Sequence, residues 1–135
     1  EEKARLLKYI NENNLNNLVK LIGYKKNIFS YLKYSKALIS TSLWEDPGFT
    51  IIEAAYCGIP IISSNCPNGP KEILDNGNGG YLFNTNSIED LINVFNSFLI
   101  DDKKEIFKKT ILTKKISAEF TLFSHYKNFK KTIND

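Results

Sequence analysis

Short apolar runs alternate along the chain with stretches in which apolar residues recur every three or four positions. The recurrence predicts helices, as in Ile28, Tyr31 and Leu32 at i, i+3, i+4. Helices are expected over roughly 1–13, 27–34, 48–57 and 70–74, and from a capping signal at Asn86–Asp90 to about 99. The apolar runs predict strands at Leu18–Gly23, Ala37–Ser42, Pro60–Ser64 and Gly80–Phe83.

This alternation predicts an α/β fold: a Rossmann-like parallel sheet of about four strands with helices on both faces. In such sheets, ligands bind beyond the carboxyl ends of the strands. All four prolines and six of the seven glycines lie between residues 47 and 80, so the tight turns gather there. A site is therefore expected in the loops after Gly23, Ser42, Ser64 and Phe83.

The tail from Asp101 onward is helical and rich in lysine, and its pattern predicts two amphipathic helices. One interpretation is that the apolar stripe packs on this domain or a neighbouring one, with the lysines solvated. The other is a basic face that meets an anionic membrane. The stripe is formed by Ile106, Ile111, Ile116, Phe120, Phe123, Tyr126 and Phe129.

Length and charge narrow the class of protein. The 135 residues suit one domain with a packed core. Residues 1–100 hold 9 basic and 10 acidic side chains and residues 101–135 hold 9 and 5, so the net +3 comes from the tail. With one arginine in the chain, we expect no nucleic-acid partner. No apolar run is long enough to span a bilayer and no signal peptide is evident, so a cytoplasmic protein is expected.

Cysteine, histidine and methionine add further expectations. Cys57, Cys66 and the single histidine, His125, lack the spacing of a metal site or a Cys–His pair, so no metal is expected and both thiols are interpreted as reduced. The chain contains no methionine, and its first residues read as a helix already under way. We expect it to be a piece of a longer protein.

The segment from Ser42 to Gly58 carries the candidate chemistry. A predicted helix begins near Gly48, and the free amides of Gly48, Phe49 and Thr50 could hold an anion. Within this apolar helix, Glu53 needs hydrogen-bond donors, because an unpaired buried carboxylate is costly. The two hydroxyls of a sugar diol would supply them.

Purely structural interpretations remain open for the same residues. Thr50 and Glu53 have the spacing of a capping box, and Asp46–Pro47 could be an N-cap followed by proline at the first helical position. Likewise, Pro67 to Pro70 could be only a turn in which Gly69 supplies a positive φ.

The whole stretch resembles the retaining glycosyltransferases of family 4, also called group 1, which have the two-domain GT-B architecture. Glu45 and Glu53 match the family's pair of glutamates separated by seven residues, followed by Ala54 and by Gly58-Ile59-Pro60. The resemblance extends upstream to Val19–Tyr24 and downstream to Asn65–Leu74 and Asn76–Leu82, so it covers essentially the whole chain.

The resemblance implies a role for each matching residue. Glu45 would contact the donor sugar and act in catalysis, and the amides of Gly48, Phe49 and Thr50 would hold sugar hydroxyls or the diphosphate. Glu53 would accept the ribose diol. The turn at Gly23, Tyr24 and Lys25 would flank the base.

The implied function is transfer of a sugar from a nucleotide diphosphate sugar, UDP-hexose or UDP-N-acetylhexosamine, to a hydroxyl acceptor on a glycan or lipid-linked saccharide, with retention and without a metal or other cofactor. Residues 1–100 would be the donor-binding domain without its beginning, and residues 101–135 helices that pack on it or on a missing N-terminal domain. The piece alone would be inactive. Lipid-linked acceptors are compatible with peripheral attachment to the inner face of the membrane. The alternative is a non-catalytic α/β module that binds a nucleotide or a protein.

Overall fold

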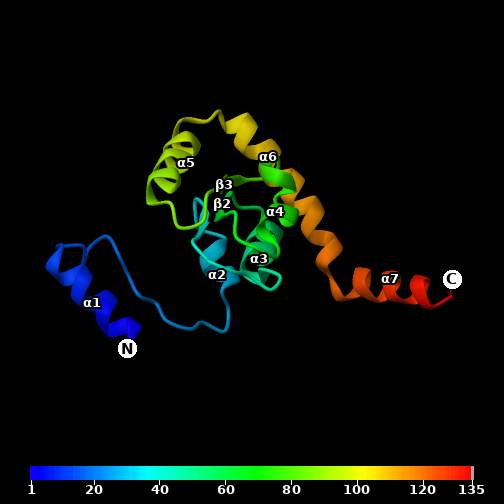
Figure 1. Ribbon diagram of the computed structural model, residues 1–135, viewed down its shortest axis with the longest axis horizontal. Helices are drawn as coiled ribbons and strands as arrows, with labels where there is room; N and C mark the ends of the chain where they lie inside the picture. Colours follow the sequence, from blue (N-terminus) through cyan, green and yellow to red (C-terminus); the bar gives the residue numbers. More distant parts are fainter. Residues whose placement is uncertain (135) are drawn as a thin grey trace.

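The computed structural model describes residues 1–134 and is built around a parallel sheet of three strands (Figure 1). The strands are β1 (Leu38–Ser40), β2 (Ile61–Ser64) and β3 (Tyr81–Phe83), and they lie in this order. Ile39 of β1 pairs with Ile62, and Ser64 pairs with Phe83. The predicted parallel α/β sheet is confirmed, with three strands instead of about four.

Helices cover both faces of the sheet, and alternate residues of β2 point into two separate cores, one on each face. Ile61 packs into a core built with α3 (Phe49–Cys57) and α4 (Pro70–Ile73), and Ile62 into one built with α5 (Ile88–Ile100). All four residues of β2 are buried, as expected for a central strand covered on both faces. Figure 1 shows α5 on one side of the sheet and α3 with α4 on the other.

The strand expected at Leu18–Gly23 is absent. This segment is an extended coil between α1 (Glu2–Glu12) and α2 (Phe29–Leu32), and Leu18, Val19 and Ile22 are exposed. An apolar run becomes a strand only when a neighbouring strand accepts and donates its backbone hydrogen bonds. No strand within residues 1–134 pairs with this run. The predicted strand was wrong because the run has no neighbouring strand to bond with.

The start of α5 follows the predicted capping signal. Ser87 is the N-cap, and its hydroxyl accepts a hydrogen bond from the Asp90 amide at 3.1 Å. The Asp90 carboxylate in turn accepts one from the Asn84 amide at 2.6 Å. The helix is thereby fixed just beyond β3, with Phe95 and Phe98 turned onto the sheet.

The tail forms α6 (Lys103–Ser117), a short 3-10 turn η2 (Ala118–Phe120) and α7 (Leu122–Asn134), with Asp135 outside the described residues. α6 packs against α3 and α4. Its buried face is polar, and the Thr113 hydroxyl donates to the carbonyl of Gly79, the residue two before β3.

Tyr81 of β3 contacts both the C-cap residue of α5 and the middle of α6. The Tyr81 hydroxyl donates to the Asp101 carboxylate at 2.7 Å, and the Lys109 ammonium lies 5.2 Å from the centre of the Tyr81 ring. Burial raises the pKa of Tyr81 well above its ordinary value, and the hydrogen bond to Asp101 and the nearby carboxylates raise it further.

The last helix, α7, extends away from the sheet (Figure 1). Phe123, Tyr126, Phe129 and Ile133 on this helix are exposed. No helix within residues 1–134 combines the length and the hydropathy needed to cross a bilayer.

Candidate functional site

The loops that leave the carboxyl ends of β1 and β2 are held against each other. The Glu45 amide donates to the Pro67 carbonyl at 3.3 Å. Gly69 has φ 124°, and a Cβ atom there would lie 2.9 Å from the carbonyl carbon of Pro47 and closer still to its oxygen. Gly69 thus has the predicted positive φ, and the turn it forms supports the loop that carries Glu45.

Helix α3 begins with Gly48 as its N-cap, in the left-handed conformation at φ 89°. The amides of Ile51 and Ile52 already donate to the Gly48 carbonyl. The amides of Gly48, Phe49 and Thr50 have no acceptor within residues 1–134. The three amides expected to hold an anion are thus free at a helix N-terminus.

This N-terminus rules out the two capping interpretations. Asp46 is not the N-cap, and Pro47 precedes the helix instead of opening it. Thr50 is the second helical residue, so it cannot form a capping box with Glu53. Glu53 is partly buried, and no group of residues 1–134 donates a hydrogen bond to its carboxylate. Glu53 therefore keeps its full capacity to accept hydrogen bonds from a ligand.

Glu45 is partly buried and oriented by serines that sequence reasoning did not single out. The Ser42 hydroxyl donates to Glu45 Oε1 at 2.6 Å, and the Ser64 hydroxyl donates to the Ser42 carbonyl at 2.5 Å. Ser40 Oγ lies 3.3 Å from Ser42 Oγ. The contact between β2 and the β1 loop joins residues 22 apart, so no local motif could have revealed it.

The structure does not bring the turn at Gly23, Tyr24 and Lys25 to this site. Tyr24 is 90% exposed, and a Cβ atom added at Gly23 would meet nothing within 4 Å. The assignment of this turn to the base stays a prediction, with no support from its position here.

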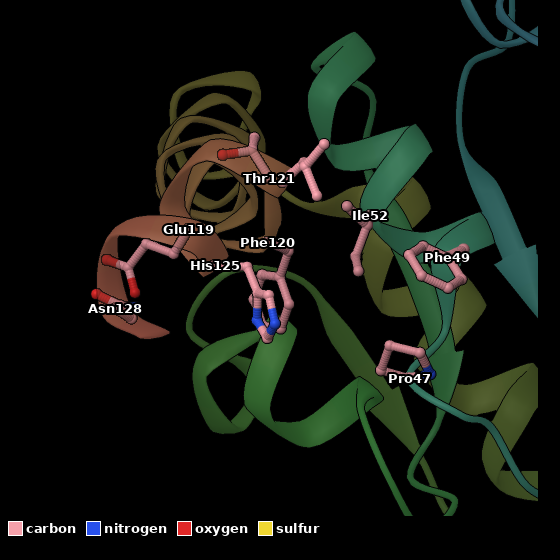
Figure 2. A pocket seen from close by; sticks show the side chains of 9 residues that line it. Pro47, Phe49, Ile52, Glu119, Phe120, Thr121, His125 and Asn128 are labelled. Carbon is pink, nitrogen blue, oxygen red and sulfur yellow. The ribbon is translucent and has the colours of Figure 1, made fainter. Parts of the chain in front are cut away.

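A groove of about 400 Å³ lies beside the start of α3, where α7 follows η2. Figure 2 shows Pro47 and Phe49 on one side and His125 and Asn128 on the other. Residues 1–134 contain no cluster of three or more His, Cys, Asp or Glu side chains that could hold a metal ion. The groove is lined by Pro47, Phe49, Ile52, Glu119, Phe120, Thr121, Leu122, His125 and Asn128.

A parallel sheet with free helix amides and carboxylates beyond its strand ends is the arrangement with which α/β domains bind ligands. Residues 1–112 match the family model of glycosyl transferases group 1, and the chain belongs to this family.

Among similar proteins, an uncharacterized glycosyltransferase of Methanocaldococcus jannaschii is 46% identical over 74 residues, which are 55% of this chain and 18% of that protein. The lipopolysaccharide 1,6-galactosyltransferase of Salmonella typhimurium is 30% identical over 102 residues, covering 76% of this chain and 28% of that protein. The chain therefore matches between 18% and 28% of the length of these two curated relatives.

Solved structures share the fold. The Anabaena protein Alr3699/HepE, in complex with UDP, has a TM-score of 0.84 at 23% identity, covering 97% of this chain and 36% of that one. A glycosyltransferase from Rickettsia africae has a TM-score of 0.80 at 24% identity, covering 95% of this chain and 35% of that one. These neighbours are GT-B glycosyltransferases, so the fold expected from the resemblance is confirmed.

Proposed function

We propose that this chain comes from the donor-binding domain of a retaining glycosyltransferase, which transfers a hexose or N-acetylhexosamine from a UDP-sugar to a hydroxyl of a glycan or lipid-linked saccharide. The observation that carries the proposal is the N-terminus of α3. Three unpaired amides lie there, and along the sequence they fall between Glu45 and Glu53, two partly buried glutamates whose spacing resembles the family's motif. The choice of UDP is supported by the UDP complex of the structurally similar Anabaena protein.

In this proposal each group at the start of α3 meets the part of the donor that suits its chemistry. The amides of Gly48, Phe49 and Thr50 stabilise the negative diphosphate as it leaves, with no metal or other cofactor required. Glu53 accepts hydrogen bonds from the two ribose hydroxyls. Glu45 accepts from a hydroxyl of the sugar and balances positive charge at the anomeric carbon.

Because the chain spans only part of the length of its relatives, we expect the groups that bind the acceptor to lie elsewhere in a longer enzyme. The chain by itself would then bind donor without turning it over. In the longer enzyme, Glu45→Gln and Glu53→Gln are both expected to lower kcat/KM strongly.

The test is a calorimetric titration of the chain with UDP. Loss of the charged acceptor in Glu53→Gln is expected to weaken binding by about 10-fold, the lower limit for a hydrogen bond to a charged group. Glu89→Gln on α5 is the matched control, because Glu89 is exposed on the helix that covers the other face of the sheet. Equal affinities of wild type and Glu53→Gln for UDP would count against the proposal and favour a non-catalytic module.

A peripheral membrane location on the cytoplasmic side is part of the proposal and rests on α7. Its exposed Phe123, Tyr126 and Phe129 lie on a helix that also carries Lys127, Lys130 and Lys131. Aromatic side chains beside lysines suit the surface of an anionic bilayer. Co-sedimentation with anionic vesicles is expected at low salt and is expected to weaken at high salt; no salt-sensitive binding would exclude this location.

A further inference from the structure

Three serine hydroxyls converge at the carboxyl ends of β1 and β2. Ser42 donates to Glu45 Oε1 and lies next to the Ser40 hydroxyl, while its own carbonyl accepts from Ser64. Ser64 is 1% exposed and Ser40 is 9% exposed, so two of the three hydroxyls are anchored in the sheet.

The directions of these hydrogen bonds follow from the number of protons available. A serine hydroxyl has one proton, and the proton of Ser42 is committed to the Glu45 carboxylate. In the contact between Ser40 and Ser42, the donor must therefore be Ser40. Each bond in such a chain polarises the next, so donation by Ser40 makes Ser42 a stronger donor.

We propose that Ser42 is a positioning residue for Glu45. It holds Oε1, and thereby presents Oε2 to a hydroxyl of the donor sugar. Ser64 fixes the backbone of Ser42, and Ser40 fixes its hydroxyl. This inference rests on the proposed role of Glu45 as a ligand of the donor sugar.

The hydrogen bond from Ser42 does more than fill space, because it fixes the orientation of the Glu45 carboxylate. The Glu45 backbone is already tied to Pro67, but a glutamate side chain keeps rotational freedom unless its carboxylate is held. The only hydrogen bond from residues 1–134 to this carboxylate comes from Ser42. Removing that hydroxyl is expected to disturb recognition of the sugar while recognition of UDP persists.

The experiment compares, for each variant, the Kd for UDP with the Kd values for UDP-glucose, UDP-galactose and their N-acetyl derivatives. The wild-type chain is expected to bind one of these sugars about 10-fold more tightly than UDP, as one charge-assisted hydrogen bond allows. The ratio of the Kd for UDP to the Kd for that UDP-sugar measures how much the sugar contributes. In Ser42→Ala, this ratio is expected to fall to about 1 to 2, while the Kd for UDP changes by less than about 2-fold. Ser42→Thr keeps the donor and is expected to restore the ratio.

Two further variants serve as a control and as a substitute for Ser42→Ala. Ser97→Ala removes an exposed hydroxyl on α5 and is expected to leave every Kd unchanged. If Ser42→Ala fails to fold, Ser42→Cys serves instead, because a thiol has nearly the same shape but is a weak donor. Its expected ratio is also about 1 to 2, since the thiol supplies no comparable hydrogen bond.

The outcomes separate this inference from the proposed function. If Glu45→Gln lowers the ratio and Ser42→Ala does not, the positioning role is overturned and the role of Glu45 stands. If Glu45→Gln keeps the wild-type ratio, or if no sugar improves on UDP, the role of Glu45 is overturned together with the inference. A wild-type chain that does not bind UDP overturns the proposed function itself.

Discussion

The substitution Gly69→Ala tests how the β2 loop supports the loop that carries Glu45. At φ 124°, alanine is strained, at a cost of about 1–3 kcal/mol. Its Cβ would also overlap the carbonyl of Pro47, and relieving such overpacking costs about another 1–3 kcal/mol. We therefore expect the free energy of unfolding to fall by about 2–6 kcal/mol, from a total of about 7–20 kcal/mol for a chain of 135 residues.

The matched control is Gly58→Ala at the end of α3. Gly58 also has a positive φ, 69°, but a Cβ there would meet only Lys114 side-chain atoms at 3.7 Å. Its expected cost is the left-handed backbone alone, about 1–2 kcal/mol. Urea denaturation followed by circular dichroism measures both variants. If Gly69→Ala lowers the free energy of unfolding no more than Gly58→Ala does, the overlap of the added Cβ with Pro47 costs nothing and the reasoning fails.

Three further predictions concern the packing around the sheet. Thr113→Val is expected to cost about 1–3 kcal/mol, because the buried carbonyl of Gly79 loses its donor, and Thr113→Ser is expected to recover most of that loss in urea denaturation. Folding raises the pKa of Tyr81, so the stability that its protonated hydroxyl contributes is complete below pH 10 and is lost as the pH rises further. Above pH 10, the urea midpoint of Tyr81→Phe is therefore expected to fall less than that of wild type. If the midpoints of the two proteins fall equally with pH, the tie to Asp101 is contradicted. Ile73→Ala is expected to cost about 2–5 kcal/mol and Ile73→Val about 0.5–1.5 kcal/mol, since Ile73 is fully buried; equal midpoints of the two would show that the core repacks.

Sequence patterns predicted the elements whose partners are close along the chain. The N-cap at Ser87 and the turn at Gly69–Pro70 were expected because a few consecutive residues supply all the groups they need. The strand expected at Leu18–Gly23 was wrong because a strand depends on a neighbour that the local pattern cannot show.

The candidate site shows the same division. The position of Glu45 and Glu53 around a helix start was foreseen from the motif, but the capping box was not realised. Its spacing was right, yet Gly48 is the N-cap and the helix begins at Phe49, so Thr50 is already the second helical residue. The hydrogen bond from Ser64 to Ser42 spans 22 residues and became visible only in the folded chain.

The central position of β2 has a consequence for motion. Its backbone groups pair with β1 on one side and β3 on the other, and all its residues are buried. Amides in such a strand exchange with solvent only when the whole domain opens, whereas loops exchange through smaller local openings. Ser64 therefore anchors the Glu45 loop to the segment that we expect to exchange most slowly, so the loop can fluctuate while its point of attachment stays fixed.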